Sequence, residues 1–166
     1  MAWDEQAVIT GVQLPEATEA QTRARLRRTQ PGAPEAAPPP AVRDVIERIG
    51  RLLRGEKDDL ADVPLALDTV PEFNRRVYEV ARTIPPGRTL TYGEIAARLG
   101  DRSMARAVGQ ALGANPFPII VPCHRVVAVG GGNGGFSATG GVRTKLRMLA
   151  LEGATANALL PLFGDE

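Results

Sequence analysis

The most constraining feature of this 166-residue sequence is that it holds one cysteine and one histidine, side by side at Cys123-His124. A lone Cys cannot form an intramolecular disulfide, and a structural zinc site usually takes four Cys or His ligands. The chain can therefore form neither an intramolecular disulfide nor a structural zinc site of this kind. Its fold must be stabilised by a hydrophobic core, which a content of 43% apolar residues allows. Cys123 is either a reactive thiol or a small buried hydrophobe, and on position alone the second is commoner.

Charge and apolar runs indicate the environment of the chain more than its partner. The net charge of +1 does not indicate any particular class of binding partner. Residues 1–69 carry nine basic and twelve acidic residues, and residues 70–166 carry eleven and seven, so we expect any anion-binding surface in the C-terminal part. No apolar run approaches the length of a membrane span, and the opening residues lack the features of a secretory signal. We therefore expect a soluble, cytoplasmic protein (nucleoid-associated if bacterial) with no membrane partner.

Proline-rich sequence divides the chain. Six of the fourteen prolines lie in residues 1–42, and the stretch 31–42 is predicted to be a linker. Before it, residues 8–14 are predicted to form a strand paired with Ala2-Trp3, and after it the apolar spacing from Val42 to Leu53 predicts a helix that stops at Gly55. We expect a truncated N-terminal α/β domain at 1–69, a second domain at 70–153 and a tail at 154–166.

The second domain begins with a predicted helix that starts at Pro71 and ends at Pro85-Pro86-Gly87. Its apolar face consists of Phe73, Val77, Val80 and Ile84. A capping box, Thr91-x-x-Glu94, then opens a short helix that runs through Leu99. Ser103 is predicted to cap a further helix, which gives a helix-turn-helix outline. Such outlines also occur in proteins that do not bind DNA.

The last of these helices has an unusual surface. Ala105, Ala107 and Gly109 are small, and Arg106 points away from the apolar side that carries Met104, Val108 and Leu112. Small side chains allow close packing against a neighbouring helix, but they also suit a thin helix that enters a narrow groove with one long cation. The minor groove of DNA, about 6 Å wide, would require such side chains.

The only cysteine follows a stretch rich in proline. Asn115-Pro116-Phe117-Pro118 precedes the apolar run Ile119-Ile120-Val121, which is predicted to be a short buried strand. The pentapeptide Pro122-Cys123-His124-Arg125-Val126 comes next. Adjacency of Cys123 and His124 does not by itself indicate a catalytic pair, since neighbours on an extended strand point to opposite faces.

This pentapeptide, with Asn115-Pro116 and residues 105–109 before it, closely resembles the O6-alkylguanine-DNA alkyltransferases, also called methylated-DNA–protein-cysteine methyltransferases. The resemblance runs from about Val70 to Gly153. It also includes Phe73, Val77, Thr91-Tyr92 and Leu151-Glu152-Gly153. It implies an α/β fold in which a reduced N-terminal strand and helix domain precedes a mostly helical, DNA-binding alkyltransferase domain with a winged-helix-like helix-turn-helix. It implies no cofactor and no metal.

The resemblance implies that Cys123 accepts the alkyl group itself, in an irreversible, stoichiometric transfer from O6 of guanine and also from O4 of thymine. Because a free thiol is mostly protonated at neutral pH, it needs activation. His124 would take its proton through a water molecule, and Glu152 would orient His124. Tyr92 would hydrogen-bond N3 of the leaving guanine, and Asn115 would brace the turn before the active-site segment.

The implied partner is double-stranded DNA that carries O6-alkylguanine, bound by a monomer through the minor groove with little sequence preference. The O6 atom is inaccessible in stacked DNA, so the nucleotide must be flipped out. Arg106 would fill the vacated place. The residues implied to contact DNA beside it are Ala105, Ala107, Gly109, Thr91 and Tyr92.

The same resemblance implies a substrate pocket formed by Pro118, Val126, Phe136 and Ser137. The chain departs from the family pattern in three ways. Its N-terminal part is short, and it lacks the cysteine and histidine ligands that some members use for an N-terminal zinc. The glycine-rich loop at 130–141 is about two residues longer than expected. Because this loop would form a wall of the pocket, its length affects which alkyl groups fit.

Three other functions are considered. A non-catalytic lesion binder of the alkyltransferase-like type shares the fold but replaces the cysteine, which is present here as Cys123. A cysteine hydrolase would also use Cys and His but would leave the small-residue helix at 105–109 unexplained. A regulator that senses methylation would need an additional domain, and residues 1–69 do not resemble one.

Overall fold

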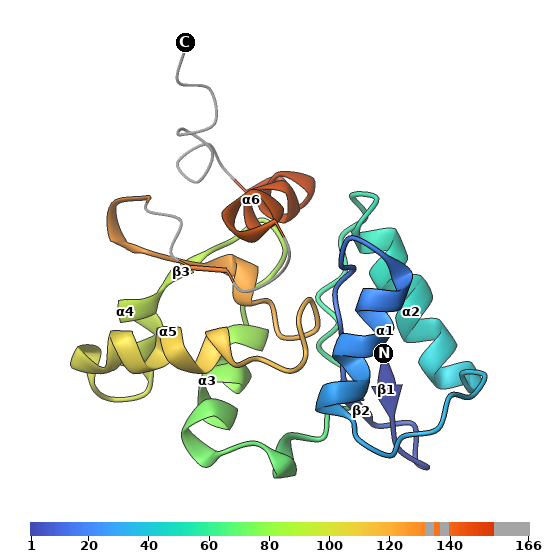
Figure 1. Ribbon diagram of the computed structural model, residues 1–166. Helices are drawn as coiled ribbons and strands as arrows, with labels where there is room; N and C mark the ends of the chain where they lie inside the picture. The colour runs from blue at the N-terminus through green and yellow to red at the C-terminus, as the bar shows by residue number, and fades with distance from the viewer. Residues whose placement is uncertain (132–134, 137–139, 155–166) are drawn as a thin grey trace.

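The computed structural model describes residues 1–131, 135–136 and 140–154 as a mixed α/β fold (Figure 1). The N-terminal part is a small hairpin with two helices. Strands β1 (Ala2–Trp3) and β2 (Ile9–Gly11) pair antiparallel, as the sequence predicts. Helices α1 (Glu19–Thr29) and α2 (Pro40–Leu52) follow, and α2 buries Val42, Val45 and Leu52 on its predicted apolar face.

Helix α1 was not predicted, because it carries no apolar stripe and none of its residues is fully buried. Local interactions stabilise it instead. The Thr18 side chain accepts a hydrogen bond from the Gln21 backbone and Gln21 returns one, which is a capping box. Arg23 pairs with Glu19 one turn earlier at 2.8 Å. The sequence signal for this helix was therefore Thr18-x-x-Gln21 before a run of good helix formers.

The C-terminal part is mostly helical, with one very small parallel sheet. Its regular elements are α3 (Glu72–Arg82), β3 (Leu90–Thr91), α4 (Tyr92–Arg98), α5 (Ala105–Gly113), β4 (Val126–Val127) and α6 (Gly141–Leu151). Short 3-10 turns lie at Leu67–Thr69, Arg102–Met104, Cys123–Arg125 and Val129–Gly131. Helices α4 and α5 form the predicted helix-turn-helix, and β3 pairs with β4 beside it. Helix α6 contacts the turn at Cys123–Arg125, and in Figure 1 it is drawn above β3.

Capping explains where the two helices of the helix-turn-helix begin. Thr91 and Glu94 form the predicted capping box on α4. The prediction that Ser103 caps α5 is wrong: Asp101 accepts from the backbone N–H of Ser103 and starts a 3-10 turn, from which α5 continues at Ala105. Aspartate is the better acceptor here, because its charged oxygen takes hydrogen bonds from both the N–H and the hydroxyl of Ser103.

The predicted strand at 119–121 is not formed, and the segment is a compact buried turn. Ile119 has a φ of +76°, a left-handed conformation that is costly for a β-branched residue. The backbone N–H of Val121 donates to Phe117, and that of Cys123 donates back to Val121. The prolines at 116, 118 and 122 have no N–H to offer a sheet, so the chain folds on itself and leads into the turn at Cys123–Arg125.

The N-terminal part packs directly on this segment. The backbone N–H of Val12 donates to the carbonyl of Pro116 at 2.9 Å, and Ile9 bridges to Leu65 just before α3. Ile9 and Val42 belong to the same buried cluster as Phe117 and Ile120. Figure 1 shows the segment after α5 lying between α5 and α1. The hairpin and α1 therefore form one side of the region around Cys123.

The structure also bears on membrane association. Among residues 1–131, 135–136 and 140–154, no helix has the length and apolar character that crossing a bilayer requires.

The turn between α3 and β3 has to approach the end of α6 closely, which leads to a prediction. Gly87 has a φ of +82°, and a Cβ there would lie 2.9 Å from the carbonyl oxygen of Glu152. Gly100 also has a positive φ, +104°, but open space around it. Gly100→Ala should therefore cost about 1 kcal/mol of unfolding free energy. Gly87→Ala should cost at least about 1 kcal/mol more, because it also pushes Glu152 away.

Urea unfolding of the two variants and the unchanged protein measures both costs. Equal losses at the two positions would show that the approach of the Gly87 turn to Glu152 does not constrain the fold.

Candidate active site

Cys123 lies at the first position of a 3-10 turn, between the buried segment 117–122 and strand β4. The thiol is partly buried, whereas His124 next to it is completely buried. A tight turn, unlike a strand, does not send neighbouring side chains to opposite faces. Cys123 and His124 therefore lie in one turn, and the alternation of faces along a strand does not apply to them.

The centre of the site is the carboxylate of Glu152, which caps the C-terminal end of α6 and is 2% exposed. One oxygen, Oε1, lies 2.9 Å from Nε2 of His124 and accepts from Nη2 of Arg125 at 2.8 Å. The other, Oε2, accepts from Nε of Arg125 at 2.9 Å. Arg125 also donates to the carbonyl of Ile84 at 2.6 Å. Glu152 thus joins the end of α6, the Cys123 turn and the end of α3.

These contacts fix the charge of Glu152. Burial alone raises the pKa of a carboxyl group, but the hydrogen bonds from His124 and Arg125 outweigh it and lower the pKa of Glu152 to about 2. The carboxylate is therefore ionised at neutral pH and can only accept hydrogen bonds. Nε2 of His124 must then carry the proton that points at Glu152.

The remaining ring nitrogen of His124 is left to act as a base. Burial lowers the pKa of His124 more than the Glu152 carboxylate raises it, so the ring is neutral at pH 7. With the proton on Nε2, the lone pair lies on Nδ1. Nδ1 is buried and has no hydrogen-bond partner among the described residues. A buried, unpartnered nitrogen with a lone pair is suited to accept a proton from a nearby thiol.

Cys123 is held as a thiol at rest but is surrounded by groups that favour the thiolate. Burial raises its pKa; a hydrogen bond from Asn115, the charge of Lys145 and the backbone N–H groups of Cys123 and His124 act in the opposite direction. Asn115 is itself fixed, since its Nδ2 donates to Val121 and its Oδ1 accepts from Phe117. These two hydrogen bonds join Asn115 to the backbone of the turn that leads to Cys123.

Tyr92 and Lys145 form the opposite side of the site. Tyr92 is the first residue of α4, and the ammonium group of Lys145 lies 5.8 Å from the centre of its ring. Lys145 is completely buried on α6, donates to the carbonyl of Val126, and burial lowers its pKa to about 8. Burial raises the pKa of Tyr92, and ionisation of Cys123 would raise it further, so its hydroxyl stays protonated and can donate.

Two cavities meet at Cys123. The larger, of about 580 Å³, opens on the helix-turn-helix side and is lined by Tyr92, Ala105, Arg106 and Gly109 together with Cys123. The smaller, of about 70 Å³, lies on the side of the N-terminal hairpin and is lined by Asn115, Pro118 and Cys123. Leu112 and Phe136 line both.

Most of the predicted site residues are brought together by these cavities. Arg106 is exposed on α5 at the mouth of the larger cavity. Five others line neither cavity: His124 and Glu152 form the buried pair, Thr91 caps α4, Ala107 lies on α5, and Val126 is buried in the core. Ser137 lies outside the described residues, as does most of the long loop at 130–141.

Sequence reasoning missed two charged residues of the site, Arg125 and Lys145. Arg125 belongs to the pentapeptide, and an arginine beside the single histidine could have indicated a partner for a buried acid. Lys145 had a signal of its own: it lies four residues before Leu149, which places it on the buried face of α6. A lysine on an apolar face is unusual enough to suggest a buried charge.

Comparisons with known proteins agree with the family resemblance of the sequence. The family model described as "6-O-methylguanine DNA methyltransferase, DNA binding domain" matches residues 72–154. A methylated-DNA–protein-cysteine methyltransferase of Methanothermobacter thermautotrophicus is 40% identical over 121 residues, which are 73% of this chain and 66% of the relative. A DNA base-flipping protein of Thermus thermophilus is 41% identical over 124 residues, 75% of this chain and 81% of the relative.

A solved structure is also similar. The crystal structure of Mycobacterium tuberculosis OGT in complex with DNA superimposes with a TM-score of 0.61 at 40% identity, over 74% of this chain and 72% of that one.

The ionised state of Glu152 leads to a prediction about acid stability. Because the folded-state pKa of about 2 lies below the ordinary 4.5, the carboxylate stabilises the fold above pH 4.5, and this stabilisation is lost as the pH falls toward 2. Glu152→Gln should therefore be much less stable than the unchanged protein at pH 7, by roughly 3 kcal/mol, since it leaves Arg125 buried without a counter-ion. The difference should shrink steadily between pH 4.5 and pH 2.

Urea unfolding of both proteins across this pH range measures the difference. A gap that stays constant down to pH 2 would mean that Glu152 is not ionised in the folded protein.

Proposed function

Because this chain belongs to the methylated-DNA–protein-cysteine methyltransferase family, we propose that it repairs DNA by moving an alkyl group from O6 of guanine onto Cys123. The transfer is irreversible, and each molecule acts once. The observation that carries this proposal is the position of the only cysteine. Cys123 lines a cavity that α5 borders with Arg106, and it precedes, in the same turn, the buried His124 that pairs with Glu152.

The first step makes the nucleophile. The thiol proton of Cys123 passes to Nδ1 of His124, through one water molecule, and the imidazolium that forms is stabilised by Glu152. The thiolate is stabilised in turn by Asn115 and by the charge of Lys145. A proton that moves between buried groups leaves the net charge of the site unchanged, which keeps the cost of burial low.

The second step is a single displacement. A bond forms between sulfur and the alkyl carbon while the carbon–O6 bond breaks, and the electron pair of that bond stays with guanine. Guanine is a poor leaving group as an anion, so a hydrogen bond at N3 from the Tyr92 hydroxyl lowers the barrier. Overall, the proton lost from sulfur ends on guanine.

The lesion reaches Cys123 only if it leaves the helix. We propose that α5 lies in the minor groove, where its small residues Ala105, Ala107 and Gly109 allow close approach. Arg106 fills the gap in the base stack, and the flipped base enters the larger cavity beside Tyr92. Thr91, at the start of α4, contacts the backbone of the DNA. Minor-groove contacts distinguish bases poorly, which suits a protein that must act in any sequence.

Several finer statements belong to the same proposal. O4-alkylthymine is a second substrate, since it presents a similar alkyl ether to the same thiolate. The protein acts as a monomer in the cytoplasm, at the DNA. The units at 1–69, 70–153 and 154–166 remain a proposed division, which the family match to residues 72–154 supports for the middle unit. Residues 155–166 lie outside the described residues.

A second candidate function is lesion binding without transfer. It is favoured by one observation, the 41% identity to a protein named for base flipping. Both functions would use α5 and Arg106, and they differ only at the thiol.

The central prediction concerns Cys123→Ser. A serine hydroxyl is a far weaker nucleophile at neutral pH, so this variant should lose alkyl transfer and retain its affinity for O6-methylguanine DNA within about threefold. Intact-protein mass after incubation with that DNA measures transfer, and fluorescence anisotropy measures binding. The unchanged protein should gain one methyl group, on Cys123. If it binds the lesion but gains no mass, the lesion-binding function is correct and the transfer proposal is wrong.

Arg106 gives a prediction that separates flipping from chemistry. Arg106→Ala should slow repair of duplex DNA by at least about tenfold, since it removes the side chain that replaces the flipped base. Reaction with free O6-benzylguanine needs no flipping and should change little. Arg102→Ala, an exposed cation on the turn before α5, is the matched control. Equal losses of Arg106→Ala on both substrates would assign Arg106 a structural role.

A further inference from the structure

The smaller cavity beside Cys123 has a wall that the chemistry of methyl transfer does not use. Its lining includes Val12, Gln13, Leu14 and Arg25, all from the N-terminal hairpin region and α1. A methyl group requires far less room than this cavity offers, because about 10–15 Å³ on the same scale accommodates a water molecule. The cavity therefore has space for a group of several non-hydrogen atoms.

The position of the cavity determines what would occupy it. The flipped base takes the larger cavity, between Tyr92 and Arg106. Displacement needs sulfur, the attacked carbon and O6 in line, so any further atoms on that carbon project sideways from this line. The space that remains beside Cys123 is the smaller cavity, between Pro118 and Phe136. The remainder of a larger alkyl group would lie there.

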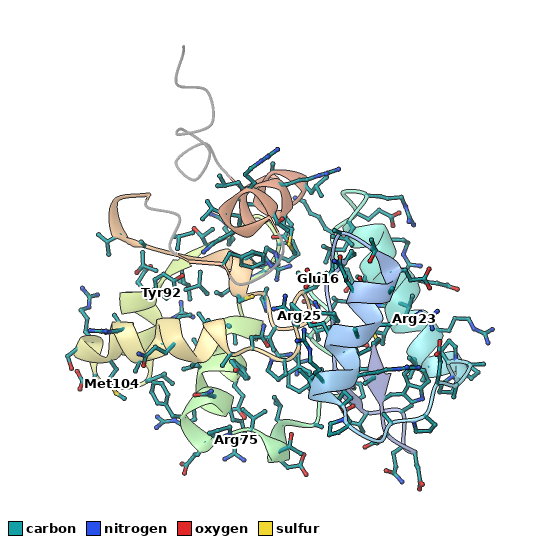
Figure 2. The ribbon with its side chains drawn as sticks, viewed as in Figure 1. Glu16, Arg23, Arg25, Arg75, Tyr92 and Met104 are labelled. Carbon is teal, nitrogen blue, oxygen red and sulfur yellow. The ribbon has the colours of Figure 1, made fainter. Side chains whose placement is uncertain are left out.

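The polar end of this cavity is cationic. Arg25 is the one charged side chain in its lining. Its Nη1 donates to Oε1 of Glu16 at 2.5 Å, and the same oxygen accepts from Nε2 of Gln13 at 3.3 Å. Glu16 is outside the lining, so it holds Arg25 from behind. Figure 2 shows Arg25 and Glu16 together in the space between α1 and the Cys123 segment.

A guanidinium group has five N–H donors, and the contact with Glu16 engages Nη1. The donors on the cavity side can bind a second carboxylate, which is the anion whose geometry a guanidinium matches best. Val12, Leu14 and Pro118 in the lining are apolar, so they offer no hydrogen bonds that compete with such a contact.

On this geometry, and resting on the proposed transfer to Cys123, we propose that Arg25 is a specificity-determining residue that favours O6 substituents ending in a carboxylate. O6-carboxymethylguanine is the smallest such lesion. Its carboxymethyl carbon bonds to sulfur as the carbon–O6 bond breaks, the electron pair stays with guanine, and the thiol proton ends on guanine. The product is S-carboxymethylcysteine at position 123, with its carboxylate against Arg25 and Gln13.

The test compares three duplexes of one sequence, which carry O6-carboxymethylguanine, its neutral carbamoylmethyl analogue or O6-methylguanine. Second-order rates of Cys123 alkylation are measured by intact-protein mass. Arg25→Met removes the charge and keeps an unbranched side chain. Because all three duplexes present the same phosphates, a general effect of Arg25 on DNA binding cancels in the ratio of rates.

Arg25→Met should lower the carboxymethyl rate at least about tenfold relative to the carbamoylmethyl rate, with the methyl rate changed less than about twofold. Arg25→Lys should restore part of the preference. Arg23→Met is the matched control, since Arg23 lies on the same helix, pairs with Glu19 and Glu35 and does not line the cavity. It should leave all three rates unchanged.

Two outcomes would overturn the assignment of Arg25. Proportional loss of all three rates in Arg25→Met would show that the pair with Glu16 only supports the fold, and unchanged rates would show that the substituent does not reach Arg25. Absence of methyl transfer in the unchanged protein would be a different result, because it would contradict the proposed transfer itself.

Discussion

The site depends on one buried carboxylate. Glu152 is the common partner of His124 and Arg125, and those two side chains follow Cys123 in the same turn. Arg125 in turn reaches the carbonyl of Ile84 at the end of α3. Burial of a charged group without a partner of opposite charge costs free energy. Glu152, His124 and Arg125 are therefore stable inside the protein only together. The fold around Cys123 and the protonation state of His124 therefore have the same cause.

This dependence explains why so little regular structure is needed near the nucleophile. Strands β3 and β4 have two residues each, and the segment before Cys123 contains a left-handed isoleucine, Ile119. Side-chain contacts replace a sheet: Asn115 bonds the backbone on both sides of the turn, and Lys145 bonds Val126. A rigid irregular turn can present a thiol between two cavities, which an extended strand with its alternating faces cannot do.

The sequence predicted those features that have local causes. The Thr91–Glu94 capping box, the apolar face of α2 and the proline-terminated α3 each follow from residues within one or two turns of one another. Glu152 was placed beside His124 only through the family resemblance, because the two are 28 residues apart. The left-handed turn at Ile119 and the burial of Lys145 escaped prediction. A β-branched residue disfavours the left-handed conformation, and a lysine disfavours burial. Tertiary packing imposes both features, and the spacing of residues along the chain does not reveal such packing.

The central claim is that ionised Glu152 fixes His124 as a neutral base with its lone pair on Nδ1. Because His124 is the only histidine in the chain, ¹⁵N NMR of the labelled protein reports on this one ring without ambiguity. At pH 7 we expect a neutral imidazole with a protonated Nε2 and an unprotonated Nδ1, and loss of this tautomer preference in Glu152→Gln. An imidazolium at pH 7, or a proton fixed on Nδ1, would contradict it.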